Sequence, residues 1–151
     1  MANTYSQIHV QIIFAVKGRN AVVKECNRIE TEKYILGIVK NLKCTPLAIY
    51  CNPDHVHLLI GLPPSIAISD LVREIKASSS KFIKTKFGCP FFAWQEGYAS
   101  FSYSRSQINQ VIKYILSQPQ HHAKREFREE FLGILQKSGM KYDEKYLFQW
   151  V

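Results

Sequence analysis

The sequence lacks the features that mark several protein classes. None of its four cysteines stands in a Cys-x-x-Cys pair, which disfavours a zinc ribbon or a dithiol redox motif. No apolar run approaches the ~20 residues of a membrane-spanning helix, and the N-terminus has no apolar stretch typical of a secretory signal. Internal repeats, low-complexity stretches and obvious linkers are also missing. We therefore expect one soluble domain, residues 1–151, with free thiols and no membrane partner, located in the cytoplasm.

The composition indicates a folded, basic protein. Hydrophobic residues make up 46% of the chain, which is enough for a real core. The formal net charge is +8, and the sequence pI is about 9.4. Such an excess of positive charge favours a polyanionic partner, and nucleic acid is the first candidate.

The hydrophobic pattern predicts alternating strands and helices. Ser104 and Gln107 form a capping-box signature that opens one helix, and Ser65 or Ser69 is a candidate cap for another. The expected strands are 5–16, 45–51, 55–62 and 98–103, and the expected helices are 27–42, 70–86, 105–118 and 124–137. Pro119 predicts the end of the third of these helices. The first six elements follow the split βαβ plan of ferredoxin-like folds, an α+β class with an antiparallel sheet and packed helices.

Two histidines stand two positions apart in the third expected strand. Alternate side chains of a strand share a face, so His55 and His57 point the same way, while Val56 points into the core. Burying two polar rings without partners is costly, and a divalent metal ion would satisfy one nitrogen of each. The alternative is a pair of histidines that alternate by chance, one of them solvated. Asp54, just before the pair, either orients a histidine ring or only completes the turn.

Two imidazoles alone hold a metal weakly, so a third ligand should exist. Tyr114 and Gln118 lie four positions apart on the expected helix 105–118 and would share a face, with Gln118 offering an amide oxygen. The alternative is a half-buried tyrosine and an exposed glutamine at a helix end. His121 or His122 could support Gln118 or bind phosphate, or could simply be solvated.

Basic residues gather on the expected helix 70–86, where serines are interleaved with them. Hydroxyl groups and cations suit contacts to phosphate. An ordinary solvated helix face is the alternative. The candidate DNA-binding residues are Arg73, Lys76, Ser79, Lys81 and Lys84, with Lys17 and Arg19 of the first turn as weaker candidates.

Three signals in order resemble one family. These are the segment Asp54-His55-Val56-His57-Leu58-Leu59-Ile60, the segment Trp94-Gln95-Glu96-Gly97-Tyr98, and Tyr114-x-x-x-Gln118 followed by His121-His122. Together they resemble the single-tyrosine transposases of the IS200/IS605 type, which belong to the HUH endonuclease group. The resemblance covers nearly the whole chain.

The resemblance implies a chemistry that fits these residue types. Mg²⁺ or Mn²⁺ would be held by His55, His57 and Gln118, and Tyr114 would attack a phosphate of single-stranded DNA at hairpin-bearing element ends. The result would be a 5′-phosphotyrosine link that a 3′-hydroxyl can reverse. Family members work as homodimers with active sites shared between subunits. The alternatives are a domesticated, repeat-associated or replication-initiator-like nickase, an inactive DNA-binding module, and a metal-dependent hydrolase that uses water.

Overall fold

The fold is built on one antiparallel sheet. The computed structural model describes residues 4–18 and 23–150. Its four strands are arranged in the order β2-β3-β1-β4, and every neighbouring pair is antiparallel. The strands are β1 (His9–Ala15), β2 (Thr45–Cys51), β3 (His55–Gly61) and β4 (Ala99–Tyr103). The expected α+β, ferredoxin-like arrangement is therefore confirmed.

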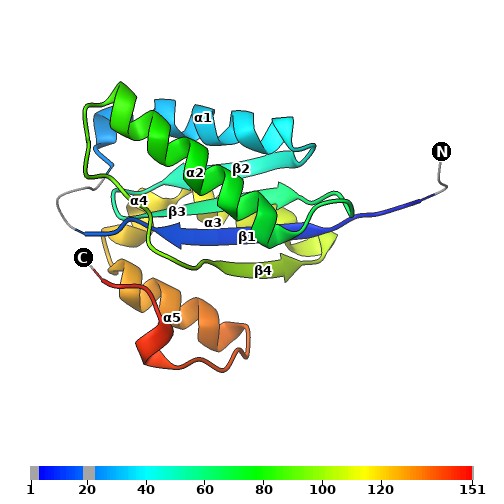
Figure 1. Cartoon of the computed structure of the whole chain (residues 1–151). Helices are drawn as coiled ribbons and strands as arrows, with labels where there is room; N and C mark the ends of the chain where they lie inside the picture. Colours follow the sequence, from blue (N-terminus) through cyan, green and yellow to red (C-terminus); the bar gives the residue numbers. More distant parts are fainter. Residues whose placement is uncertain (1–3, 19–22, 151) are drawn as a thin grey trace.

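Two long helices cover one face of this sheet. Helices α1 (Arg28–Asn41) and α2 (Ile68–Lys86) lie next to each other above the strands (Figure 1). Alternate residues of the two central strands face these helices and form the larger apolar core: Val10, Ile12 and Phe14 from β1, and Val56, Leu58 and Ile60 from β3. The predicted alternation of β1 and the inward direction of Val56 are thus observed.

The remaining helices pack on the opposite face. They are α3 (Ile108–Leu116), α4 (Gln118–His122) and α5 (Phe127–Lys137), with short 3₁₀ turns η2 (Glu25–Asn27), η3 (Arg105–Gln107) and η4 (Glu144–Tyr146) elsewhere. Ile115 of α3 packs on Leu59, while Phe131 and Leu135 of α5 pack with Ile13. Both faces of the central strands are therefore buried, and polar side chains on this second face are enclosed under helices.

The expected end of helix 105–118 and the expected caps of helix 70–86 are wrong. The expected helix 105–118 is divided, because α3 ends at Leu116 and Gln118 begins the short helix α4. Pro119 lies in the first turn of α4, where no backbone N–H is needed, so it starts a helix instead of ending one. The capping box of Ser104 and Gln107 is present as expected. Neither expected serine caps α2, whose N-cap residue is Ala67.

An aromatic cluster attaches the end of the chain to α5. Phe148 and Trp150 pack around Phe127 and Phe131, with ring centroids 5.0 Å apart for Phe131 and Phe148. Figure 1 places α5 on the far side of the sheet from α1 and α2, with the C-terminal segment beside it. Among the described residues, no helix combines the length and the apolar character that crossing a membrane requires.

Candidate active site

The two histidines of β3 meet under the helices of the second face. The turn before them is closed by a bond from the Asn52 amide to the His55 carbonyl over 2.8 Å. In the ladder with β1, His55 lies opposite Ala15 and His57 opposite Ile13. Both side chains are fully buried, and their ring centroids are 5.0 Å apart. The predicted shared face is therefore observed.

Hydrogen bonds orient both rings from behind. The Nδ1 atom of His55 lies 2.7 Å from a carboxylate oxygen of Asp54, so Asp54 orients the ring as the first of its two interpretations predicted. The Nδ1 atom of His57 lies 2.9 Å from the side-chain amide of Gln11, whose oxygen accepts a 2.7 Å bond from the Tyr103 hydroxyl. The Nε2 atoms of both rings are thereby directed at the same space. His55 donates its Nδ1–H to a carboxylate, as metal-binding imidazoles do, whereas Nδ1 of His57 accepts from the Gln11 amide nitrogen.

A carboxylate from α5 lies in that space. The Oε1 atom of Glu130 is 3.0 Å from Nε2 of His57 and 3.3 Å from Nε2 of His55. His122 of α4 brings a third imidazole, with Nε2 at 3.5 Å from the same oxygen. Glu130 is 2% exposed, so its carboxylate is surrounded by these rings instead of by water.

The second oxygen of Glu130 faces the tyrosine. The Tyr114 hydroxyl donates a short hydrogen bond to Oε2, and the Gln118 amide nitrogen donates to the same atom over 3.2 Å. The Tyr114 ring centroid lies 5.9 Å from that of His57. Tyr114 and the histidine pair of the same chain are therefore neighbours, although Tyr114 and Gln118 belong to different helices.

Gln118 is enclosed on all sides. The expectation of an exposed glutamine at a helix end is wrong, because the residue has no exposed surface. Its Oε1 atom accepts bonds of 3.0 Å from the side-chain amide of Asn52 and from Nε2 of His122. His122 thus supports Gln118, which was one of the functions considered for it.

The cluster shifts the pKa values of its members in opposite directions. Burial lowers the pKa of His57 to about 4, against the opposing effect of Glu130. Burial also acts to lower the pKa of His55, but its bonds to Asp54 and Glu130 prevail and raise it. Burial would raise the pKa of Glu130, yet the bonds from His122, His55 and His57 hold it well below its usual range.

The tyrosine is strongly held in its neutral form. Burial comes first, and the bond to the Glu130 carboxylate adds to it, so that the pKa of Tyr114 is raised well above its usual value. A phenolate next to an ionised carboxylate would face like-charge repulsion. At neutral pH the phenol therefore keeps its proton, and that proton points at Glu130.

The donor set fits a divalent cation. One ligand atom from each of His55, His122 and Glu130 lies within 4.8 Å of the other two. Imidazole nitrogens and a carboxylate oxygen are ordinary ligands of divalent metals, and the oxygen suits Mg²⁺ or Mn²⁺. His57 and Gln118, two of the three expected ligands, line the same cluster through their bonds to Glu130.

Sequence reasoning missed Glu130. A signal was present, because Glu130 follows Phe127 by three positions and precedes Ile134 by four, so it lies on the apolar stripe of the expected helix 124–137. A carboxylate on such a stripe needs buried partners. Its partners are distant in the sequence, however, and only the folded chain identifies them.

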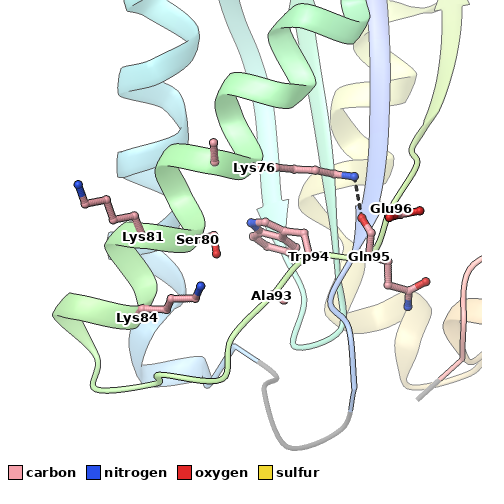
Figure 2. A pocket seen from close by; sticks show the side chains of 9 residues that line it. Lys76, Ser80, Lys81, Lys84, Ala93, Trp94, Gln95 and Glu96 are labelled. Atoms are coloured by element: carbon pink, nitrogen blue, oxygen red, sulfur yellow. Dashed lines mark hydrogen bonds between the residues drawn. The ribbon is translucent and has the colours of Figure 1, made fainter.

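The basic candidates on α2 differ in their surroundings. Lys81 and Lys84 are exposed and, together with Trp94 and Glu96, line an open groove between α2 and the segment before β4 (Figure 2). Lys76 lines the same groove, but its ammonium group donates to the carbonyl oxygens of Gln95, at 2.8 Å, and Gly97.

The prediction that Ser79 contacts DNA at the surface is wrong. It has no exposed surface, its hydroxyl donates to the Ile75 carbonyl oxygen, and it accepts a 3.0 Å bond from the Trp94 indole. The serine therefore holds the core of the fold together at this point. Arg73, in contrast, is exposed and forms an ion pair with Asp70 one turn earlier.

Lys17 is on the other side of the segment 94–96. It lines a second groove with Glu96, Lys145 and Tyr146. Arg19, the other weaker candidate from the first turn, falls outside the described residues. The structure therefore gathers Lys81, Lys84 and Lys17 along two neighbouring grooves.

Comparison with known proteins identifies the family. The family model described as IS200-like transposase matches residues 4–118. A solved transposase candidate from Deinococcus radiodurans R1 is 24% identical with a TM-score of 0.61, covering 78% of this chain and 95% of its own. A REP-associated tyrosine transposase bound to a REP hairpin is 17% identical with a TM-score of 0.60. That match covers 81% of this chain and 73% of the transposase chain. A search among curated proteins gives no match. The two structures share the fold, and the family model matches most of the sequence: the chain belongs to the IS200-like transposase family.

Proposed function

We propose that this protein is a DNA strand transferase that cleaves and rejoins single-stranded DNA at insertion-sequence ends, with Tyr114 as the nucleophile. The observation that carries the proposal is the meeting of the Tyr114 hydroxyl, the His55–His57 pair and Glu130 in a chain of this family. A largely buried cluster of this composition is costly to build and is typical of a functional site.

The proposed step exchanges one phosphate ester for another. The phenolic oxygen of Tyr114 forms a bond to phosphorus while the bond to the 3′ oxygen breaks, which leaves a 5′-phosphotyrosine and a free 3′-hydroxyl. The phenol proton, which is hydrogen-bonded to Oε2 of Glu130, ends on the leaving 3′ oxygen, so the exchange needs no other proton source. Because the ester bond is conserved, the reverse step rejoins DNA without a nucleotide cofactor.

His55, His57 and Gln118 are the residues that we propose to hold Mg²⁺ or Mn²⁺. When bound, the cation polarises the scissile phosphate and stabilises charge on the leaving oxygen. Asp54 and Gln11 keep the two imidazoles in fixed orientations, so these two ligands need little rearrangement. The Gln118 amide has to turn its oxygen away from Asn52 and His122 to bind the cation. The helices α3, α4 and α5 cover the two histidines and Gln118 and leave Tyr114 and His122 partly exposed.

Lys81, Lys84 and Lys17 are proposed to contact the DNA backbone. All three lie on the grooves that flank the segment 94–96, and exposed lysines can follow a strand of phosphates. Arg73 and Lys76 are weaker members of this set, since each is already paired within the fold. The relative solved with a REP hairpin makes a hairpin with single-stranded flanks the first substrate to test.

The test is a covalent adduct assay. The wild-type protein is incubated with labelled single-stranded DNA that carries the hairpins flanking its gene, with Mg²⁺ or Mn²⁺, and the products are separated on a denaturing gel. We expect a protein–DNA adduct that Tyr114→Phe does not form, whereas Tyr34→Phe, matched in chemistry and exposed on α1, still forms it. An equal adduct with Tyr114→Phe contradicts the proposal. Cleavage without any adduct indicates a water-using hydrolase, and DNA binding without cleavage indicates an inactive module.

The subunit that supplies the tyrosine can be determined separately. We expect a homodimer, and within one chain Tyr114 already lies beside His57, which favours action on its own histidine pair. Mixing Tyr114→Phe with His57→Ala tests this, because only exchange between subunits restores a complete site. Activity of the mixture supports shared sites, and continued inactivity supports a site made by one chain.

A further inference from the structure

We propose that Glu130 of α5 is a ligand of the divalent cation, so that the metal centre includes a residue beyond the segment that the family model matches. This inference rests on the proposed function, because it concerns the same site. The match ends at residue 118, and Glu130 follows on a separate helix. The chemical class of the ligand is a hard, oxygen-preferring divalent cation, which we represent by Mn²⁺.

Geometry is the first argument. The Oε1 atom of Glu130 is the oxygen that lies against both Nε2 atoms of the strand pair, at 3.0 Å from His57 and 3.3 Å from His55. Those nitrogens point at it because Asp54 and Gln11 hold the opposite side of each ring. The oxygen lies close enough to both nitrogens for all three atoms to bind one cation placed among them.

The orientation of Gln118 is the second argument. Its amide oxygen is occupied by Asn52 and His122, both at 3.0 Å, and it is the amide nitrogen that faces Glu130. An N–H group is a donor and cannot bind a cation. As folded, the oxygen presented to the histidine pair therefore belongs to Glu130, while Gln118 helps to fix that carboxylate.

Chemistry is the third argument. Mg²⁺ and Mn²⁺ prefer oxygen ligands, and an ionised carboxylate binds them more strongly than a neutral amide. With Glu130, the set combines two imidazoles with one negative charge. Without it, the set would contain only neutral ligands for a doubly charged ion.

The packing of α5 keeps this carboxylate in place. Phe127, one turn before Glu130, stacks on the His55 ring at 3.7 Å between centroids and 9° between planes. Phe127 and Phe131 are both buried in the aromatic cluster with Phe148 and Trp150. Helix α5 is therefore fixed directly to one of the proposed ligands, and Glu130 cannot move far from the histidines while the helix stays docked.

The experiment measures Mn²⁺ binding to the full chain without DNA, from the decrease of the free-ion signal in electron paramagnetic resonance. We compare wild type, Glu130→Gln, which keeps the shape and removes the charge, and Glu129→Gln, an exposed neighbour on the same helix. We expect the dissociation constant to rise about tenfold or more for Glu130→Gln, and to stay at the wild-type value for Glu129→Gln. Circular dichroism checks that each variant is folded.

Three results overturn the inference. They are equal affinities of wild type and Glu130→Gln, equal losses in both variants, and no measurable Mn²⁺ binding by the wild type. Should Glu130→Gln fail to fold, Glu130→Asp keeps the charge and withdraws the oxygens by one methylene, and it must still weaken binding relative to Glu129→Gln. Because no DNA is present, these outcomes are independent of the Tyr114 adduct assay, which can fail while Glu130 binds metal, or succeed while it does not.

Discussion

The indole N–H of Trp94 donates to the hydroxyl of Ser79 over 3.0 Å, in the core between α2 and the segment before β4. The pair connects two parts of the chain that both line the groove with Lys81 and Lys84. This hydrogen bond therefore helps to set the shape of the groove along which we propose that DNA binds.

Ser79→Ala should destabilise the protein by about 1–3 kcal/mol, because it leaves the buried indole N–H without an acceptor. Urea unfolding followed by fluorescence measures this change. The adjacent Ser80→Ala is the control, and its partly exposed position should keep the change within about 0.5 kcal/mol. Equal stability of both variants would show that the Trp94–Ser79 bond contributes little.

Lys81→Ala and Lys84→Ala should weaken DNA binding and reduce its dependence on salt. Each lysine that contacts a phosphate of a single strand contributes about 0.7 to the slope of log affinity against log salt concentration. Fluorescence anisotropy with a labelled strand at several salt concentrations gives that slope. Lys40→Ala on α1, equally exposed, is the matched control and should leave the slope unchanged. Unchanged slopes for all three variants would remove the α2 groove from the DNA path.

Gln95→Ala should loosen the C-terminal segment. The Gln95 side chain accepts from the Gln149 amide at 2.7 Å and donates to the Gln149 carbonyl oxygen at 2.6 Å. Loss of the two bonds, each worth about 1 kcal/mol, corresponds to about thirtyfold faster exchange of the Gln149 amide hydrogen. Hydrogen exchange read by NMR measures it, with Gln136→Ala, exposed on α5, as the control. Exchange as slow as in the wild type would mean that the aromatic cluster alone holds the segment.

The cysteines should differ sharply in reactivity. Burial, with the neighbouring Glu32 carboxylate, raises the pKa of Cys51 well above its ordinary value, whereas Cys26 is exposed. The thiolate is the reactive form, so iodoacetamide at about pH 8.5 should modify Cys26 quickly and leave Cys51 unmodified. Mass spectrometry of the digested protein shows which thiols reacted. In urea both should react, and fast labelling of Cys51 in the folded protein would contradict its burial.

Local patterns were sufficient to predict the framework of the fold. The alternation in β1 and β3 identified the strands and the shared face of His55 and His57, since side-chain direction in a strand depends only on position. The capping box was equally local, because Ser104 and Gln107 interact within one turn. Features of this kind require no knowledge of what packs against them.

Contacts between distant segments were beyond such patterns. Glu130 is brought to the histidines by the docking of α5, and Ser79 is buried because Trp94 folds over it. The end of α3 at Leu116 was missed for a different reason: Pro119 was interpreted as a stop signal, although it fits the first turn of a new helix. The expectations that failed mostly concerned which side chains are buried, as for Glu130 and Ser79, and less often which residues form helices or strands.

The ladder between β1 and β3 has a consequence for folding errors. His55 and His57 alternate with Val56 and Leu58, so a shift of β3 by one position would turn both imidazoles toward α1 and α2 and expose their apolar neighbours to the cluster under α5. Two unpaired rings would then be buried among hydrocarbon side chains, at a cost of several kcal/mol. The same two side chains thus penalise misaligned pairing of the central strands, and a slipped conformer would be both unstable and unable to assemble its polar centre.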